Sequence, residues 1–278
     1  MKLIHYLNGE FVPEEKLLIS PRDLGYMRGY AVFDFFRTYN GHKPFMFDYH
    51  IERFFNSAKM IGLSLPWTKE EIKSVITKTL EKNDMSKEFV MRIIASGGVS
   101  TLQMSNTSPT LVVMVDEAIN FPKSIYEKGI NVSTLEHKRY SPASKTTHYT
   151  EAFQHMEKMH AEGSGEILYV HDNCILEGAF SNFFCVINAK LVTAKNGVLP
   201  GITRLVVIEK LNLKVPVEVR DLKYQELDSA TEAFISVSGK RIVPVVKVGD
   251  KSIGNGKVGP ITKEVISKFD TFVASGKW

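Results

Sequence analysis

The stretch ILEGAFSNFF at residues 175–184 and the stretch LPGITR at residues 199–204 carry the features that decide the fold and chemistry of this chain. In the first, Glu177 stands in a turn between two apolar runs typical of strands. In the second, Gly201 leads into a helical pattern, which places backbone amides and the Thr203 hydroxyl at a helix N-terminus, where anions bind. Each stretch also has an ordinary interpretation, as a turn acid and as a plain helix start. The rest of the chain has to distinguish the two.

The N-terminal third predicts two hairpins and two helices. Asn-Gly pairs at residues 8–9 and 40–41 lie between apolar runs and are strong signals for tight hairpin turns. Asp48 is expected to cap the helix that follows it, and Thr68 with Glu71 forms the capping-box pattern that opens the next helix. Two further strands are expected at residues 88–96 and 109–118.

Asn120 and Pro122 interrupt this rhythm, and we expect the junction between two domains there. The later part predicts a helix from Tyr149, several hairpin strands and a last helix from about Ile261. The fold class is therefore α/β of the α+β type, with mixed, mostly antiparallel sheets and flanking helices rather than a doubly wound sheet. The expected division is a smaller N-terminal α/β domain at residues 1–118, a linker at residues 119–128 and a larger C-terminal domain at residues 129–278.

Composition and charge exclude several classes of protein. The 278 residues are 44% hydrophobic and 24% charged, as in globular proteins, and no apolar run approaches the roughly 20 residues of a membrane helix. The net charge of +4 is scattered among acids rather than gathered in a basic stripe, so no nucleic-acid partner is expected. The N-terminus lacks a signal-peptide pattern, and two cysteines in so long a chain suggest reduced thiols. A cytoplasmic location is expected.

Motifs for nucleotide, metal and acyl-transfer chemistry are weak. GNGKVG at residues 254–259 matches a dinucleotide fingerprint in letters, but only one helix follows it, so a turn before that helix is expected. His155 and His160 are five residues apart and lie well off one helical face. The sequence has no GxSxG motif, and neither cysteine stands in a convincing Cys–His pattern. We therefore expect no metal site and no acyl nucleophile.

One class of chemistry needs a single lysine without a metal or an acyl nucleophile, namely Schiff-base formation with a carbonyl cofactor. Lys145 lies in RYSPASKTTHY at residues 139–149, just before a helical pattern. Pyridoxal 5'-phosphate also requires a carboxylate at its ring nitrogen, and helix-terminal amides with an arginine for its phosphate. Glu177, the Gly201 turn and Arg53 can supply these groups. Arg53 also has an ordinary interpretation, as a surface arginine whose stem covers apolar atoms.

The order of these motifs resembles the fold-type IV pyridoxal-phosphate enzymes, also called class IV aminotransferases. FMFDYHIERFFNSAKMIGL, KTTHY, LEGAFSNFF, LPGITR, FISVSGKRIVPV and IGNGKVGPIT follow in that family's order and span nearly the whole chain. The resemblance implies a two-domain enzyme whose cofactor lies between the domains, near the interface of a homodimer.

The resemblance also implies roles for single residues. Lys145 would bind the cofactor and then carry the substrate proton. Glu177 would be the partner of the pyridine nitrogen, and Tyr149, one helical turn after Lys145, the partner of the phenolic oxygen. The implied phosphate site consists of Arg53, Gly201, Ile202, Thr203, Ser238 and Gly239.

Two arginines are candidates for binding substrate carboxylates, Arg28 in YMRGYAVFDFF and Arg92 in EFVMRIIASGG. The family's branched-chain enzymes carry a tyrosine two residues before the second arginine, whereas Val90 stands here. The Arg28 run, with Asp34 in place of a common glutamate, is closer to the D-amino acid transaminases. We therefore expect transamination between an amino acid, with D-amino acids favoured, and a 2-oxo acid such as 2-oxoglutarate or pyruvate.

Three alternatives stay open beside this prediction. The first is a branched-chain L-amino acid aminotransferase, the second a lyase similar to the aminodeoxychorismate enzyme, and the third a relative that binds cofactor without useful turnover. Arg28 and Arg92 also have ordinary interpretations, as an interface ion pair and a strand-edge ion pair. Side-chain specificity is expected to depend on pocket residues such as Phe33, Phe35 and Arg37.

Overall fold

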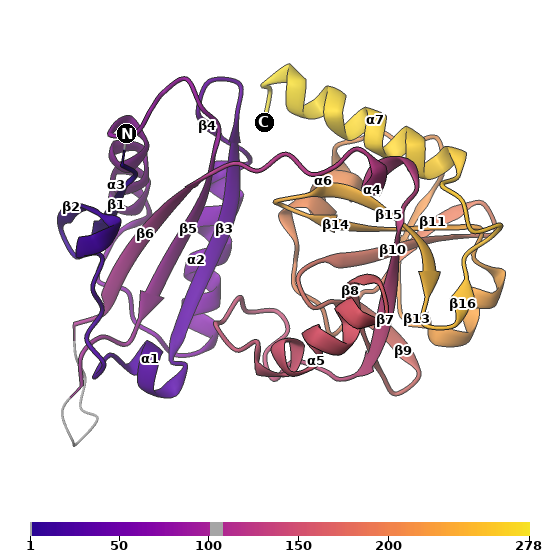
Figure 1. Cartoon of the computed structure of the whole chain (residues 1–278), viewed down its shortest axis with the longest axis horizontal. Coiled ribbons are helices and arrows are strands. Elements are labelled where there is room, and N and C mark those ends of the chain that lie inside the picture. The colour runs from indigo at the N-terminus through magenta and orange to yellow at the C-terminus, as the bar shows by residue number, and fades with distance from the viewer. Residues whose placement is uncertain (1, 101–107) are drawn as a thin grey trace. The chain divides into compact units, whose positions relative to one another are not determined.

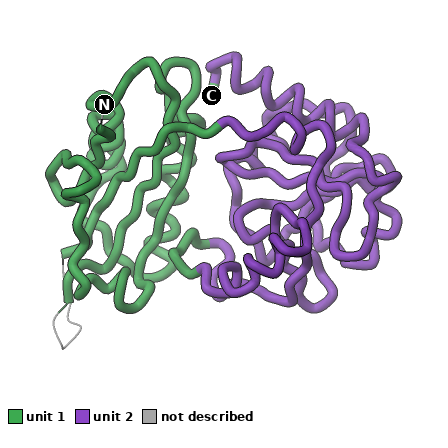
Figure 2. The backbone as a smooth tube through the Cα atoms, viewed as in Figure 1, with its two compact units in different colours: residues 1–119, 144–148, 278 green, residues 120–143, 149–277 purple. Residues whose placement is uncertain are grey.

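The computed structural model describes residues 2–100 and 108–278. The chain divides into two compact units, which Figure 2 shows in separate colours. Unit 1 comprises residues 1–119, 144–148 and 278, and unit 2 comprises residues 120–143 and 149–277. Residues 144–148 therefore pack with unit 1, although the chain on either side of them belongs to unit 2.

Unit 1 is built on a six-stranded antiparallel sheet, in the order β2-β1-β6-β5-β3-β4, that packs against two helices (Figure 1). The apolar faces of these helices and of the sheet form one core, in which Phe36, Phe54 and Ile93 are fully buried. Burial of this apolar area is the main stabilising contribution to the unit. Its elements are β1 (Ile4–Leu7), β2 (Glu10–Pro13), η1 (Glu14–Lys16), α1 (Leu24–Arg28), β3 (Ala31–Tyr39), β4 (Lys43–Pro44), α2 (Phe47–Met60), α3 (Lys69–Glu81), β5 (Phe89–Ser96) and β6 (Thr110–Glu117).

Most local predictions for unit 1 are confirmed. Antiparallel pairing of β1 with β2 and of β3 with β4 confirms the two Asn-Gly hairpins. The capping box of Thr68 and Glu71 is present at the start of α3. The predicted cap at Asp48 is wrong, because α2 begins at Phe47 with Met46 at its N-cap. The bond from Phe45 N–H to Arg37 O turns the hairpin directly into the helix. Asp48 therefore lies in the first helical turn.

Unit 2 contains a ten-stranded mixed sheet that closes on itself. Nine strands follow the order β12-β11-β10-β14-β15-β7-β8-β9-β13, and the tenth, β16, pairs with β15 beside this path. An added pairing of β9 with β10 closes a ring from β10 through β14, β15, β7 and β8. Closure removes most of the strand edges on which other chains could pair. The elements are α4 (Ser124–Glu127), β7 (Ile130–Glu136), α5 (Thr150–Ala161), β8 (Ser164–His171), β9 (Cys174–Gly178), β10 (Asn182–Ile187), β11 (Lys190–Thr193), α6 (Ile202–Glu209), β12 (Val217–Val219), β13 (Leu222–Lys223), η2 (Tyr224–Ser229), β14 (Glu232–Val237), β15 (Arg241–Val248), β16 (Lys251–Ser252) and α7 (Pro260–Ser275).

The expected fold class is confirmed, since the sheets are mixed, mostly antiparallel and flanked by helices. Parallel pairs occur only in unit 2 among the described strands, where β7 pairs with β8 and β15, and β11 with β12. The GNGKVG stretch forms the predicted turn before the last helix. Gly254 and Gly256 have φ of +54° and +70° there, a conformation that glycine adopts without strain.

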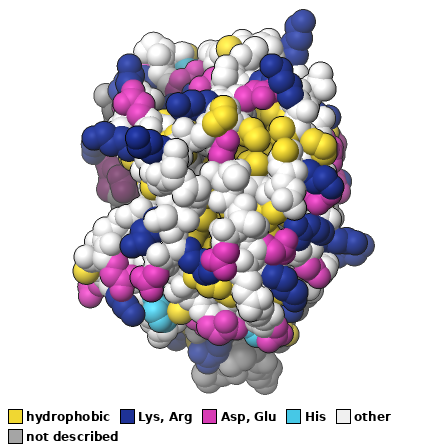
Figure 3. Space-filling view, turned by 90° about the vertical axis from the view of Figure 1, so that its right-hand side faces the viewer, with side chains coloured by type: hydrophobic (Ala, Val, Ile, Leu, Met, Phe, Trp, Pro, Cys, Tyr) yellow, Lys and Arg dark blue, Asp and Glu magenta, His cyan; other side chains and the backbone are white. Residues whose placement is uncertain are grey.

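Surface and composition of the described chain give few other signs of function. Within residues 2–100 and 108–278, no helix is both long and apolar enough to cross a bilayer. On the face shown in Figure 3, lysines and arginines lie among aspartates and glutamates rather than in one basic patch. Cys174 and Cys185 are not joined in a disulfide.

Candidate active site

Lys145 lies in an extended segment of unit 1 that runs along β3, on the edge opposite β5. Phe33 N–H donates to Lys145 O at 2.9 Å, and Lys145 N–H donates to the Ser57 hydroxyl of α2 at 3.0 Å. The Lys145 ammonium lies 4.5 Å from the centroid of the Phe33 ring. The backbone of this lysine is therefore fixed by a strand and a helix, while its side chain lies against an aromatic ring.

The expectation that Tyr149 follows Lys145 by one helical turn is wrong. α5 begins at Thr150, and Tyr149 is its N-cap residue in unit 2. The segment before it is held in strand-like pairing instead, since Thr146 bridges Val32 and Thr147 N–H donates to Ala31 O at 3.3 Å. The competing interaction that prevents an earlier helix start is thus a long-range pairing with β3.

Arg53 is buried in unit 1 in a bidentate ion pair with Asp34. Its Nε donates to Asp34 Oδ2 and its Nη2 to Asp34 Oδ1, both at 2.8 Å. His50 Nδ1 lies 2.6 Å from Asp34 Oδ1, and Phe35 N–H donates to the same oxygen at 2.8 Å. Arg53 is 7% exposed and Asp34 fully buried, so the interpretation as a surface arginine does not apply. Such a planar, two-point pair fixes the guanidinium in one orientation.

Charges in this cluster are set by opposing effects. Burial by itself raises the pKa of Asp34, but Arg53 and His50 outweigh it and hold that pKa well below its usual range. Burial lowers the pKa of His50 despite its contact with Asp34. Since Asp34 is ionised and only accepts hydrogen bonds, neutral His50 carries its proton on Nδ1. The helix spacing of His50, Arg53 and Ser57 places all three on the buried side of α2, so one helix orients Arg53 and also supports Lys145.

Arg92 lies on a face of the unit 1 sheet that also carries two aromatic rings. Phe33, Phe35 and Arg92 are half-buried, and they alternate with buried residues along β3 and β5. Phe35 pairs with Arg92 across the strands, and the Arg92 guanidinium lies 5.7 Å from the centroid of the Phe35 ring. The ammonium of Lys145 therefore lies in a row with the Phe33 and Phe35 rings and the Arg92 guanidinium.

Two other arginines of unit 1 differ from Arg92 in their surroundings. Arg28, the last residue of α1, is exposed, and its Nη1 donates to Met27 O at 3.0 Å. Arg37 is buried at 8% exposure, and its Nη1 donates to Ile119 O at 3.3 Å. Arg92 is therefore the candidate carboxylate partner that lies in the row with Lys145.

Glu177 is the central carboxylate of unit 2. It lies in β9 and pairs with Asn182 of β10, so the prediction that it stands in a turn is wrong, because the pairing that closes the ring keeps it within a strand. Arg139 donates to Glu177 Oε1 from Nε at 2.8 Å and from Nη2 at 2.6 Å. Leu199 N–H donates to Glu177 Oε2 at 2.7 Å. The side chain is 4% exposed, and Arg139, Leu199 and, at 3.5 Å, the Asn182 amide hold it as an acceptor in a fixed position.

The N-terminus of α6 offers backbone amides, and it lies in the same unit as Glu177. Gly201 is the N-cap, no side chain caps the helix, and Thr203 in its first turn is buried. A Cβ at Gly201 would stand 1.9 Å from Asn182 Oδ1, so only glycine fits there. Asn182 in turn donates to Leu199 O at 2.9 Å. Ser238 and Gly239 lie in the turn from β14 to β15.

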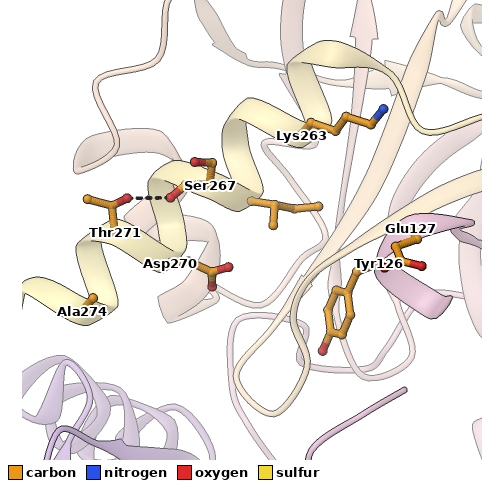
Figure 4. A pocket seen from close by; sticks show the side chains of 8 residues that line it. Tyr126, Glu127, Lys263, Ser267, Asp270, Thr271 and Ala274 are labelled. Atoms are coloured by element: carbon orange, nitrogen blue, oxygen red, sulfur yellow. Dashed lines mark hydrogen bonds between the residues drawn. The ribbon is translucent and has the colours of Figure 1, made fainter. Parts of the chain in front are cut away.

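The predicted residues thus form two sets, one in each unit. Lys145, Arg53, Arg92, Arg28 and the predicted pocket residues Phe33, Phe35 and Arg37 belong to unit 1, whereas Glu177, Tyr149 and the rest of the predicted phosphate site belong to unit 2. An open groove of about 650 Å³ on unit 2, lined by α4 and α7, contains none of them (Figure 4). Across the described ranges, no group of three or more His, Cys, Asp and Glu side chains is placed to hold a metal ion.

Sequence reasoning missed Arg139, His50 and the function of Asp34. Arg139 stands six residues before Lys145 in RYSPASKTTHY. Asp34 lies in YMRGYAVFDFF, and His50 lies in FMFDYHIERFFNSAKMIGL. A charged residue inside an apolar strand, as Asp34 is, was the available signal, because such a residue is buried only with a partner. The identity of that partner could not be derived from spacing alone.

Comparisons with known proteins identify the family of this chain. The family model for class IV amino-transferases matches residues 31–248, and the chain belongs to this family of aminotransferases. It is 34% identical, over 95% of its length and 94% of the relative's, to a Methanocaldococcus jannaschii protein assigned as a branched-chain-amino-acid aminotransferase. It is 28% identical to the D-alanine aminotransferase of Staphylococcus haemolyticus, over 97% of this chain and 98% of that one.

Among solved structures, the fold matches the T.th. branched-chain amino acid aminotransferase that was crystallised with pyridoxamine 5'-phosphate. The TM-score is 0.90 at 24% identity, and the match covers 99% of this chain and 95% of the other. The predicted family and fold are therefore confirmed.

Proposed function

We propose that this aminotransferase uses pyridoxal 5'-phosphate, with Lys145 as the residue that binds it. The single observation that carries the proposal is the fixed backbone of Lys145, whose amine shares one sheet face with Phe33 and Arg92. The presence of pyridoxamine 5'-phosphate in the structurally similar branched-chain enzyme supports the same choice of cofactor.

The residues of unit 2 fit this cofactor. A buried carboxylate at Glu177 suits a protonated ring nitrogen, and it is already oriented by donors from Arg139 and Leu199. The start of α6, with Gly201, Ile202 and Thr203, suits a phosphate, as do Ser238 and Gly239. Arg53 would supply the guanidinium for the same phosphate.

Each side chain has a separate task in transamination. When bound, pyridoxal phosphate supplies a carbonyl for the substrate amine and an electron sink for the Cα–H bond. Lys145 Nζ would hold the cofactor first and would then move the proton at substrate Cα. Glu177 would keep the ring nitrogen protonated, and the Tyr149 hydroxyl would donate to the phenolic oxygen. Asp34 keeps Arg53 oriented throughout.

For the substrate we propose an amino acid, with D-amino acids favoured, and a 2-oxo acid acceptor such as 2-oxoglutarate or pyruvate. Arg92 and Arg28 would bind the carboxylate, and Phe33 and Phe35 would contact the side chain. The similarity to the Staphylococcus haemolyticus D-alanine enzyme supports this choice. Branched-chain L-amino acids are the second candidate, because two aromatic rings line the Lys145 row and the 34% identical relative carries that assignment.

An absorbance titration tests both parts of the proposal. Purified protein with pyridoxal phosphate should show the visible band of lysine-bound cofactor, and K145A should not, whereas K158A, at an exposed site on α5, should retain it. Addition of D-alanine, D-glutamate, L-leucine or L-glutamate then identifies the amino donor by loss of the band. Loss with L-leucine alone would assign the branched-chain activity. Turnover of aminodeoxychorismate without loss to any amino acid would identify a lyase and reject the proposal.

We also propose a homodimer and a cytoplasmic location. Both follow from the family resemblance. Sedimentation equilibrium of the cofactor-loaded protein checks the first, and a mass of one chain, 31.3 kDa, would contradict it.

A further inference from the structure

Phe180 is an aromatic side chain beside the proposed cofactor residues of unit 2. It lies between β9 and β10, three residues after Glu177, and is 43% exposed. Its ring stacks on the Tyr149 ring with a centroid distance of 5.3 Å and an interplanar angle of 6°. The Phe153 ring meets Phe180 edge-on at 6.4 Å and 82°. Parallel, offset rings and edge contacts are the favoured arrangements of aromatic pairs.

The backbone that carries Phe180 is itself fixed by the core of unit 2. Ser181 Oγ donates to the buried Glu166 carboxylate at 3.0 Å, and Ala179 N–H donates to Ile167 O at 2.8 Å. A Cβ at Gly178 would stand 2.2 Å from Ser181 Oγ, so the corner is tightly closed. Phe180 is therefore presented from a rigid corner, whereas Tyr149 lies at the start of a helix that has no side-chain cap.

We propose that Phe180 is a positioning residue for Tyr149, an inference that rests on the proposed function. The Phe180 ring has no polar atom and can act on Tyr149 only through the stack. By fixing the plane of the Tyr149 ring, it fixes the direction in which the hydroxyl points, and so the hydrogen bond to the phenolic oxygen of the cofactor. The corner residues Glu166 and Ser181 support this role by holding the backbone of Phe180.

A pH titration of the visible band in the loaded protein tests the inference. A donated hydroxyl stabilises negative charge on the phenolic oxygen, so its loss raises the apparent pKa of the lysine-bound cofactor. We expect Y149F to raise that pKa by about one unit. F180L should raise that pKa by about half a unit, whereas F180Y, which keeps an aromatic ring, should leave it at the wild-type value. F153L, which keeps the Phe180–Tyr149 stack, serves as the matched control and should leave it unchanged.

The double variant separates positioning from a general effect. In the Y149F background, F180L should cause no further shift, because the hydroxyl that it orients is gone. An equal shift in both backgrounds, or none in F180L alone, would overturn the inference.

A second measurement needs no cofactor. The Tyr149 ring-proton NMR shifts of the unloaded protein should change in F180L and not in F153L, and unchanged shifts in F180L would also overturn the inference. If the wild type shows the stack by NMR but never forms the visible band, the proposed function is wrong. The contact between Phe180 and Tyr149 is then still established.

Discussion

Two buried carboxylates, Asp34 in unit 1 and Glu166 in unit 2, have surroundings that shift their pKa values in opposite directions. Asp34 is fully buried and accepts two bonds from the Arg53 guanidinium. Glu166 is 5% exposed and accepts from the Ser181 hydroxyl at 3.0 Å and from Ile167 N–H at 2.9 Å. The pKa of Asp34 is lowered, whereas burial raises the pKa of Glu166 to about 7.

The difference shows that burial does not by itself decide the charge of a carboxyl group. Desolvation raises the pKa of both groups, and at Asp34 the contacts with Arg53 and His50 reverse the sign. At Glu166 the neutral donors and the more distant Lys240 lower the pKa without reversing the sign. Unit 1 therefore holds Arg53 with a permanent anion, while unit 2 holds the Phe180 corner with a group that titrates near neutral pH.

The largest expected effect is that of D34N. The substitution leaves Arg53 as a buried charge without its counter-ion, which destabilises proteins by about 3–5 kcal/mol. It should also weaken the binding of pyridoxal phosphate, since Arg53 loses its orientation. Urea unfolding of the cofactor-free protein measures the first effect, and the absorbance titration measures the second.

A matched control for D34N is D48N. Asp48 forms an ion pair with Lys73, but its side chain is 80% exposed, so little change in stability is expected. Equal effects of the two substitutions would mean that the buried pair contributes no more than a surface pair.

The pH dependence of stability is the next largest effect and has a definite sign. Between its ordinary value of 4.5 and about 7, Glu166 binds a proton in the folded state that the unfolded chain has released. The free energy of unfolding therefore falls as pH rises through this window, by up to about 3 kcal/mol from this group. E166Q should flatten the profile between pH 4.5 and 7. Urea unfolding at a series of pH values checks this, and an unchanged slope would contradict it.

Local signals explain which parts of this fold could be predicted. The Asn-Gly hairpins and the capping box of Thr68 and Glu71 depend on residues within a few positions of each other, and these predictions are confirmed. The position of Lys145 depends on Ser57, 88 residues away, and so its segment could not be assigned to unit 1.

The candidate site shows the same limit. Residue type and motif order indicated Lys145, Glu177 and Arg53, because the chemistry requires those groups. Their counter-ions could not be derived, since Arg139 is 38 residues from Glu177 and Asp34 is 19 residues from Arg53. A sequence specifies such pairs only through the tertiary fold.

Glu177 is a third buried carboxylate, and the loss of its cation, Arg139, should destabilise the protein less than the loss of the Asp34–Arg53 pair does. R139Q removes the guanidinium, but Glu177 retains the bond from Leu199 N–H, and Arg139 is already 12% exposed. We expect a loss of about 2 kcal/mol, less than that of D34N. R220Q, in the more exposed pair with Glu226, is the control and should cost less than about 1 kcal/mol. A loss as large as that of D34N would contradict the ranking.

The smallest effect, expected for S181A, tests whether neutral donors tune Glu166. The substitution removes the hydroxyl that donates to the carboxylate and should cost about 1 kcal/mol. Because this hydroxyl stabilises the ionised form, its loss should raise the pKa of Glu166 above about 7. The window in which stability falls then extends to higher pH. The carboxyl carbon shift of Glu166, followed by NMR against pH, measures the pKa directly.

S86A removes the corresponding serine bond to an exposed carboxylate, Asp84, and should leave the pKa of Glu166 unchanged. If S181A instead lowers the pKa of Glu166, water has entered the corner and replaced the hydroxyl as donor. The charge of Glu166 would then depend on hydration, and its contrast with Asp34 would come from solvent access rather than from the nearby guanidinium.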